Sequence, residues 1–407
     1  MSYFKTAVGG LSWTAGLRGV LRVITILRMA VLARILTKAS LGVFGIVTMV
    51  LGLLEISTET GINIFLMQEK SKIDKFIDTA WIISIIRGVL IAVLILLTAP
   101  WVSSFFNSPD TLNLLYLLSV VPLIRGFINP AVIIFLKELH FGREFALRGS
   151  VFALEAGVSI FVSWYTRSPV GLVWGLMASA IFEVILSWLF IRPVPKFNFN
   201  LSQAQTILNR GKWVTGFGLL DYLFTQSDNI VVGRLLGEAS LGVYQYAYKI
   251  SSTPVSEIVD VFYRTTFPIF SQMTNSEKNI KSAVIKTLLL TNSLTIALGL
   301  LIFVFAKYII LILFGPSWLD AVPVLQILAF LGIARGMAYS FNAVFMAQQQ
   351  QKYVTLIILT GTVGLLITIV PAVQMWGIMG AALAATFGAV LSLPVAIYLA
   401  HKSFKSL

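Results

Sequence analysis

The sequence has no cysteine and only two histidines, His140 and His401. Without cysteine the chain has no disulfide, no thiolate nucleophile and no zinc–thiolate site, and two isolated imidazoles do not make a metal site. Charge is also scarce, because Asp, Glu, Lys and Arg together make up 12% of the 407 residues, against about 25% in soluble proteins. So few charges cannot cover a protein that is surrounded by water.

Hydrophobic residues fill most of the chain instead. They make up 57% of it, and the mean hydropathy is +0.89. A membrane-spanning helix needs about 20 apolar residues, so the chain has room for roughly a dozen spans with short connections. The apolar runs are too long for strands and do not alternate, and no stretch is polar enough to form a separate soluble domain. The composition predicts an all-α, polytopic membrane protein.

Twelve transmembrane helices are predicted from the apolar runs between charge clusters and turn residues. The first is not a cleaved signal peptide, because Arg18, Arg22 and Arg28 interrupt its apolar stretch. The predicted spans are 10–33, 41–67, 78–101, 110–136, 147–166, 170–191, 212–235, 240–267, 284–306, 319–346, 353–374 and 377–400.

The two halves of the chain resemble each other. Residues 33–45 read ARILTKASLGVFG and residues 233–245 read GRLLGEASLGVYQ, with seven of thirteen positions identical. Both copies lie where the first span of a half meets the second. Six spans in each half give both halves the same orientation, which predicts two parallel six-helix repeats around a central cavity. We assign 1–195 and 212–407 to the two lobes, and the polar, proline-containing segment 196–211 to a cytoplasmic linker.

Basic residues are distributed unevenly between the two sides of these spans. With the N-terminus inside, seventeen Lys and Arg residues lie in cytoplasmic segments and five lie outside, namely Arg34, Lys38, Arg167, Arg234 and Lys307. Because cytoplasmic loops carry the excess of positive charge, both termini are predicted to be cytoplasmic. The formal net charge of +13 is interpreted as this asymmetry and not as a nucleic-acid-binding surface.

Sixteen ionisable residues lie inside the predicted spans. Each costs roughly 2.5–3.5 kcal/mol near mid-bilayer on insertion scales, so they must pair with one another or line a hydrated cavity. The bases are Arg18, Arg22, Arg28, Arg87, Arg125, Lys249, Arg264 and Arg335, and the acids are Glu55, Glu59, Glu155, Glu183, Asp221, Asp228, Glu257 and Asp260.

Two interpretations of these residues remain open. Interhelical salt bridges would hold the bundle together, whereas arginines in a hydrated cavity would bind an anionic group, for which the planar guanidinium is suited. Helical spacing places Arg18 and Arg22 on one face of the first span. The candidate substrate-binding residues are Arg18, Arg22, Arg28, Arg87, Arg125, Lys249 and Arg335, and the candidates for proton or cation coupling are Glu55, Glu59, Asp221, Asp228, Glu257 and Asp260.

Several segments resemble a known transporter family. They are 32–47 (LARILTKASLGVFGIV), Gly61, 228–250 (DNIVVGRLLGEASLGVYQYAYKI), 267–273 (FPIFSQM) and 313–329 (LFGPSWLDAVPVLQILA). In these segments the chain resembles the polysaccharide transporter family of the multidrug/oligosaccharidyl-lipid/polysaccharide exporter superfamily, the Wzx-type flippases. The resemblance implies a cavity between two six-helix lobes that moves undecaprenyl-pyrophosphate-linked oligosaccharide across the bacterial cytoplasmic membrane. Many relatives have fourteen spans, whereas twelve are expected here.

The expected ligand has a charged pyrophosphate, a polar glycan and a polyprenyl tail, and cavity arginines suit the first of these. The sequence has no nucleotide-binding loop, metal motif or large outer domain, so we expect neither enzymatic activity nor a cofactor. A proton or sodium gradient is left open as the energy source. The expected partners are the lipid-linked oligosaccharide and membrane lipids, with a polysaccharide polymerase and chain-length machinery as further candidates. The alternatives are a cation-coupled multidrug exporter and, after it, a membrane-embedded glycosyltransferase or polymerase.

The predicted topology can be tested on this naturally cysteine-free chain. Single cysteines at Ser71, Ser202 and Ser276 are expected to react with a membrane-impermeant thiol reagent only from the cytoplasmic side, and cysteines at Ser108 and Ser317 only from outside. Labelling of intact and opened cells measures this. Consistent labelling of position 202 from outside would overturn the scheme of two six-span halves.

Overall fold

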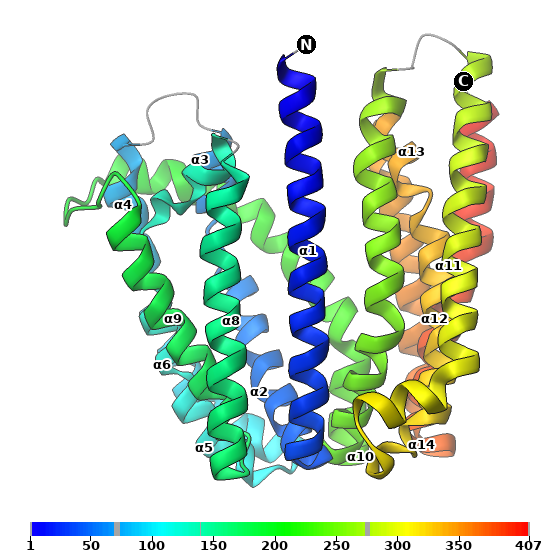
Figure 1. The fold of residues 1–407 in the computed structure, drawn as a ribbon, viewed down its shortest axis with the longest axis horizontal. Coiled ribbons are helices and arrows are strands. Elements are labelled where there is room, and N and C mark those ends of the chain that lie inside the picture. Colours follow the sequence, from blue (N-terminus) through cyan, green and yellow to red (C-terminus); the bar gives the residue numbers. More distant parts are fainter. Residues whose placement is uncertain (1, 69–73, 139, 273–276, 406–407) are drawn as a thin grey trace. The chain divides into compact units, whose positions relative to one another are not determined.

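The computed structural model describes residues 2–68, 74–138, 140–272 and 277–405. Every regular element in these ranges is a helix, as Figure 1 shows. The packing of the chain separates two compact units, Met1–Gln226 and Ser227–Leu407, which are described one at a time below.

The observed units and the predicted lobes divide the chain at different places. The predicted linker is 196–211, whereas the compact units meet at Gln226, inside the long helix α10 (Leu201–Gln272). The start of α10 belongs to the first unit because it packs there. Ile207 is fully buried in a core cluster of that unit, and the hydroxyl of Tyr222 donates a 2.6 Å hydrogen bond to the carbonyl of Met49. The predicted six-span lobes stay a prediction.

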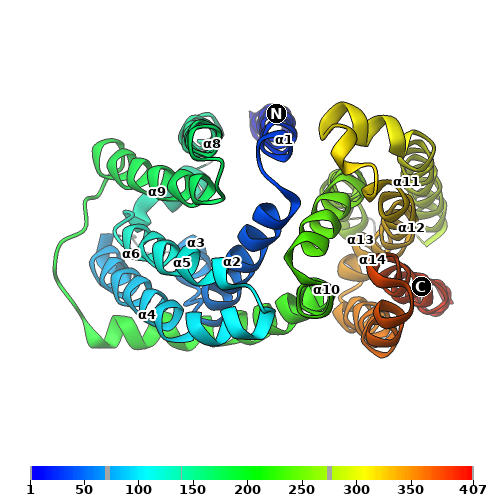
Figure 2. The ribbon, with the colours of Figure 1, turned by 90° about the horizontal axis from the view of Figure 1, so that it is seen from below.

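Among its described residues, the first unit holds nine further α-helices and one 3-10 helix ahead of the start of α10. Helix α8 packs along α9 and α1 packs along α8, and Figure 2 looks nearly along α1 and α8. These elements are α1 (Ser2–Ile35), α2 (Lys38–Ser57), α3 (Ile62–Gln68), α4 (Asp74–Phe106), α5 (Pro109–Leu118), α6 (Val120–Arg125), η1 (Pro130–Ile133), α7 (Ile134–Lys137), α8 (Phe141–Thr166) and α9 (Val170–Phe190).

The second unit contains the rest of α10 and the elements that follow it. Helix α12 packs against both α11 and α14. These elements are α11 (Glu277–Leu313), η2 (Pro316–Trp318), α12 (Ala321–Tyr339), α13 (Asn342–Ala347) and α14 (Gln351–Lys405).

Two of the long helices change direction at a glycine, between spans that the sequence separates. In α10 the break is at Gly237, with φ 79° and ψ 178°, and in α14 it is at Gly377, with φ 58° and ψ −136°. Residues with a Cβ rarely adopt such angles, so glycine allows the chain to turn there. Each of these helices therefore holds two predicted spans, 212–235 with 240–267 and 353–374 with 377–400.

Two other predicted spans are interrupted. The span predicted at 41–67 is α2 and α3, separated by the turn at 58–61. The span predicted at 110–136 contains α5 and α6 followed by η1 and α7, with a bend of 71° between the two pairs. Asn129 caps the second pair, since its side-chain oxygen accepts from the backbone nitrogen of Ala131 at 2.9 Å. Both interruptions bring polar backbone and side chains into the apolar part of the unit.

Seven helices of the described residues are long and apolar enough to cross a membrane, or eight if the bent pair counts as one span. They are α2, α4, α8, α9, α11, the α12–α13 pair and α14, and α14 is long enough for two crossings. Helices α1 and α10, which hold the predicted first, seventh and eighth spans, are not among them. These two helices carry many of the charged residues found within the predicted spans.

The internal repeat marks the same feature in each unit. Thr37 lies between α1 and α2 and caps α2, with its hydroxyl accepting from the backbone nitrogen of Ser40 at 3.1 Å. Its counterpart in the second copy is Gly237, the break in α10. The leucines that follow, Leu41 and Leu241, are 2% and 0% exposed. The repeated sequence therefore encodes a turn between two helices and the first buried residue after it.

Close helix packing in the first unit depends on Gly88 of α4. A Cβ added there would lie 2.4 Å from the carbonyl oxygen of Pro122 on α6. Because that oxygen belongs to the backbone, no side-chain rotation relieves the clash. Gly88 thus sets how closely α4 approaches α6.

We predict that Gly88→Ala destabilises the first unit by about 1–3 kcal/mol, the usual cost of overpacking a core. The matched control is Gly157→Ala on α8, where an added Cβ meets nothing within 4 Å. Thermal unfolding of the purified protein in detergent measures both. An equal melting temperature for the two variants would contradict the close approach of α4 and α6.

Candidate functional site

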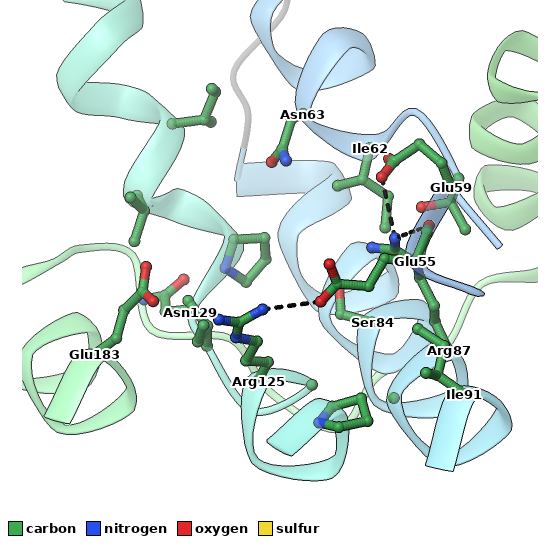
Figure 3. A pocket seen from close by; sticks show the side chains of 18 of the residues that line it. Glu55, Glu59, Ile62, Asn63, Ser84, Arg87, Ile91, Arg125, Asn129 and Glu183 are labelled. Atoms are coloured by element: carbon green, nitrogen blue, oxygen red, sulfur yellow. Dashed lines mark hydrogen bonds and ion pairs between the residues drawn. The ribbon is translucent and has the colours of Figure 1, made fainter. Parts of the chain in front are cut away.

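The first unit contains a pocket of about 570 Å³, a size typical of small-molecule sites. Its walls come from α2, α3, α4, α6, η1, α7, α8 and α9 and from the two interruptions described above (Figure 3). Six ionisable side chains line it: Glu55, Glu59, Arg87, Arg125, Arg148 and Glu183. Four of these were predicted from the sequence as substrate-binding or ion-coupling residues.

Arg87 of α4 is fixed by three acceptors at the end of α2. One terminal nitrogen (Nη2) donates to the carbonyl oxygen of Glu55 at 2.6 Å and to Oε2 of Glu59 at 3.1 Å. Its Nε donates to the hydroxyl of Thr58 at 3.3 Å. The other carboxylate oxygen of Glu59 accepts from the backbone nitrogen of Gly61 at 3.0 Å, and Gly61 has a φ of 67°. The turn between α2 and α3 thus holds the carboxylate against the guanidinium.

Arg125, at the end of α6, pairs with the side chain of Glu55. Its Nη1 lies 2.8 Å from Oε1 of Glu55, and the two side chains are 35% and 33% exposed. Figure 3 shows the two side chains pointing toward each other within the pocket. Both pocket arginines that the sequence predicts as anion ligands therefore carry a carboxylate partner, and both pairs remain in contact with solvent.

Glu183 lies on the wall formed by α9, beside Asn129 in Figure 3. It is half-buried, and it makes no hydrogen bond or ion pair with the side chains that the structure describes. The remaining pocket base, Arg148 of α8, pairs with Glu144 one turn before it at 3.0 Å. Glu183 is consequently the pocket carboxylate whose charge no described base offsets.

Arg28 forms an ion pair of its own, away from these pocket residues. Its Nη1 lies 2.5 Å from Oε1 of Glu155, which joins α1 to α8. The side chains of Arg28 and Glu155 are only 13% and 15% exposed. The pair is an interhelical salt bridge, as the first of the two interpretations of the sequence predicts. Arg28 was also a candidate for substrate contact.

The second unit contains a buried polar cluster. Asp228 is 1% exposed. Its carboxylate accepts hydrogen bonds from the hydroxyl of Tyr244 at 2.9 Å and from the backbone nitrogen of Asn229 at 2.8 Å. Arg335 donates to the hydroxyl of Tyr248 and lies over its ring, 5.6 Å from the centroid. The rings of Tyr244 and Tyr248 lie 6.2 Å apart on α10. The two tyrosines thus bring Asp228 of α10 and Arg335 of α12 into one cluster.

The other candidates are not brought together in this way. Arg22 is exposed on α1, and Lys249 is exposed on α10 with its ammonium 5.9 Å from the ring centre of Tyr246. Glu257 and Asp260 are half-buried further along α10. The side chains of Arg18, Asp221 and Arg264 lie outside the described part of the protein. The assignments of all these residues stay predictions.

Several partners were not predicted from the sequence. Tyr244 and Tyr248 lie one turn apart in a stretch that reads YQYAYK, and that spacing was a signal for a shared polar face. Glu155 was recognised as an acid within a span, but nothing in its own sequence context indicates Arg28. Within the described residues, no group of three or more His, Cys, Asp or Glu side chains could hold a metal ion.

The profile of a known family, described as polysaccharide biosynthesis protein, matches residues 31–323, more than half of the chain. The chain belongs to the polysaccharide biosynthesis protein family. The match confirms the resemblance seen in the sequence, since it covers most of the segments that carry it.

Individual members of this family are distant but extend over most of the chain. The lipopolysaccharide biosynthesis protein WzxC of Escherichia coli strain K12 is 22% identical over 393 residues, which are 96% of this chain and 79% of WzxC. The teichuronic acid biosynthesis protein TuaB of Bacillus subtilis strain 168 is 25% identical over 358 residues, 85% of this chain and 72% of TuaB.

Solved structures of the same fold come from transporters. The lipid II flippase MurJ, in an inward closed conformation, has a TM-score of 0.75 at 14% identity and covers 97% of this chain and 89% of its own. A multidrug resistance transporter of the MATE family, in an inward-facing conformation, has a TM-score of 0.73 at 15% identity, with 95% of both chains covered. The likeness confirms the predicted fold class, an all-α polytopic membrane protein with twelve transmembrane helices.

The ion pairs allow a quantitative prediction. Arg28→Gln is expected to destabilise the protein by about 3 kcal/mol, because it leaves the carboxylate of Glu155 buried without its partner. Arg125→Gln is expected to cost about 1 kcal/mol, since water screens a pair that is one-third exposed. Chemical denaturation in detergent measures both values.

A double variant tests whether the loss at Arg28 comes from the unpaired charge. Arg28→Gln combined with Glu155→Gln is expected to recover part of the stability that Arg28→Gln alone loses, because no charge is then left unpaired. If the two losses simply add, the pair does not contribute through its charge.

Proposed function

We propose that this protein is a flippase that moves an undecaprenyl-pyrophosphate-linked oligosaccharide across the bacterial cytoplasmic membrane by alternating access, for the synthesis of O-antigen, capsule or exopolysaccharide. The observation that carries the proposal is the pocket of the first unit, where two guanidinium groups lie within a membrane-spanning bundle, each held by a glutamate. Membership of the polysaccharide biosynthesis family supports it. The likeness to WzxC, a lipopolysaccharide biosynthesis protein, and to MurJ, a lipid II flippase, supports it as well.

The pocket suits a diphosphate because of what each arginine can do. A guanidinium donates parallel hydrogen bonds to phosphate oxygens. Because Arg87 and Arg125 come from different helices, they can bind one diphosphate from two sides. Both are already paired with Glu59 and Glu55. A diphosphate that binds must therefore displace these carboxylates from the arginines.

This exchange of partners would couple ligand binding to a proton or cation gradient. A carboxylate that loses its arginine partner inside the bilayer is stable only when it takes up a proton or binds a cation. Binding of the diphosphate would thus load Glu55 and Glu59 with protons or sodium, and release of the ligand would restore the ion pairs. Arg18, Arg22, Arg28, Lys249 and Arg335 remain further candidates for ligand contact; Asp221, Asp228, Glu257 and Asp260 remain candidates for coupling.

Location and partners follow from the proposed ligand. We place the protein in the cytoplasmic membrane with both termini in the cytoplasm, where the excess of basic residues lies. The lipid-linked oligosaccharide enters from the inner leaflet, and a polysaccharide polymerase with its chain-length machinery would receive it outside. No covalent step is part of the proposal.

A cation-coupled multidrug exporter is the second candidate, and Glu183 is the observation that favours it. A pocket carboxylate with no described partner would attract a cationic drug or a coupling cation. Against this candidate, the same pocket is lined by three arginines, which repel organic cations.

The proposal is tested by complementation of a strain that lacks its own flippase for the cognate glycan. Arg125→Ala is expected to abolish surface polysaccharide while the protein still reaches the membrane, and Arg125→Lys to retain part of the activity because the charge is kept but the planar fork is lost. Arg143→Ala, an exposed arginine of the same unit outside the pocket, is the matched control and should be fully active.

Two outcomes would contradict the proposal. Full activity of Arg125→Ala at normal expression would show that this pocket does not hold the anionic group. Normal polysaccharide together with a loss of drug resistance in Glu183→Gln would favour the exporter instead.

A further inference from the structure

Residues 192–208, which we call the interfacial segment, are held firmly against the first unit, although residues 196–208 were predicted as part of a polar linker. The carbonyl of Pro193 accepts from the side-chain amide of Asn129 at 3.0 Å. The backbone nitrogen of Lys196 donates to Asp78 at 2.8 Å. The hydroxyl of Thr79 donates to Gln203 at 2.8 Å. The segment is therefore a fixed part of the surface and not a loose tether.

This fixed segment exposes large apolar side chains. Phe197 is 81% exposed, Phe199 48%, Leu201 64% and Leu208 47%. The stretch FNFN at 197–200 alternates apolar and polar residues, and the chain bends at Phe197, where the backbone nitrogen of Asn198 donates to the carbonyl of Lys196 at 2.8 Å. Leu201 and Leu208 lie two turns apart on one face of α10, and the buried Ile207 lies about 100° round the helix from them. Such a surface is unfavourable in water.

The segment lies at the border of the membrane-spanning region. It follows directly on the end of α9 at Phe190, and it contacts the first turns of α4, where a predicted span begins. Phe197 packs on Trp81, with 4.7 Å between ring centres, and Trp81 packs on Trp188 at 5.3 Å. Tryptophans are enriched at the level of the lipid headgroups.

The direction of the first turns of α10 is consistent with a position at the level of the lipid headgroups. Figures 1 and 2 show that the first turns of α10, in green, run across the long axis of α8 and not along it. A helix that crosses the ends of transmembrane helices lies parallel to the membrane plane. Basic residues flank the exposed apolar ones, with Arg192 and Lys196 both exposed. Apolar side chains on one face with lysine or arginine beside them are typical of helices that lie in the membrane interface.

We propose that the interfacial segment is embedded in the headgroup region of an anionic lipid leaflet, with Phe197, Phe199, Leu201 and Leu208 in the acyl boundary and Arg192 and Lys196 at lipid phosphates. The inference concerns a lipid-binding surface and stands independently of the transported ligand. Embedding of the segment would also fix the depth of the connection between α9 and α10 in the membrane.

Site-directed spin labelling tests the proposal on the cysteine-free chain. The full-length protein carries one nitroxide at position 197, 208 or 198 and is reconstituted into vesicles of phosphatidylcholine and phosphatidylglycerol. Labels at 197 and 208 are expected to collide more with oxygen, which dissolves in lipid, than with a water-soluble nickel chelate. The label at Asn198, an exposed polar residue between the two phenylalanines, is the matched control and should show the reverse.

The remaining outcomes each count against the proposal. Preference for the nickel chelate at 197 and 208 would place the segment in water, and low collision with both reagents would mean that another protein chain covers it. Phosphatidylglycerol is expected to move the label at 197 deeper than phosphatidylcholine alone, and Lys196→Gln to reduce that shift. An equal depth in both vesicles would remove the role of the basic residues.

Discussion

A charged side chain within a bilayer must have a partner or water, and this requirement determines which helices of the first unit meet. Arg28 joins α1 to α8 through Glu155, Arg87 joins α4 to the end of α2 through Glu59, and Arg125 joins α6 to α2 through Glu55. Each pair consists of residues far apart in the sequence. The pairs thus act as long-range contacts in a largely apolar bundle.

These pairs differ in their access to solvent, and the difference bears on which of them suits the proposed ligand site. The Arg28–Glu155 pair is almost fully enclosed, so exchanging its partners would leave a bare charge in a low-dielectric environment. The pairs at Arg87 and Arg125 are about one-third exposed within a pocket. In the proposed function an anionic ligand replaces these carboxylates, and water that reaches the pairs would solvate the intermediate. Such a site would suit a transporter for an anionic lipid, because the arginines pair with the protein's own glutamates again when the ligand has left.

The interruptions in the helices are as important for the pocket as the charges. A continuous second span would place Glu59 one turn beyond Glu55 on the same helix face. The turn at 58–61 instead holds Glu59 through the backbone of Gly61 and directs its carboxylate to Arg87. The bend near Asn129 similarly opens the wall below Arg125. Neither interruption was predicted, because both segments are apolar enough to be read as single helices.

The sequence alone determined the fold class, the approximate position of the spans and the family, because hydrophobic length and local turn residues are properties of short segments. It also indicated Glu55, Glu59, Arg87 and Arg125 as candidates, since a charge within an apolar run is visible in one dimension. Only the tertiary structure decided which acid meets which base, that Arg28 belongs to an enclosed salt bridge, and that residues 192–208 lie fixed on the surface. Those outcomes depend on which helices pack against each other. Close contacts at positions such as Gly88 contribute to that packing. The helical periodicity of a single segment does not encode its partner helix.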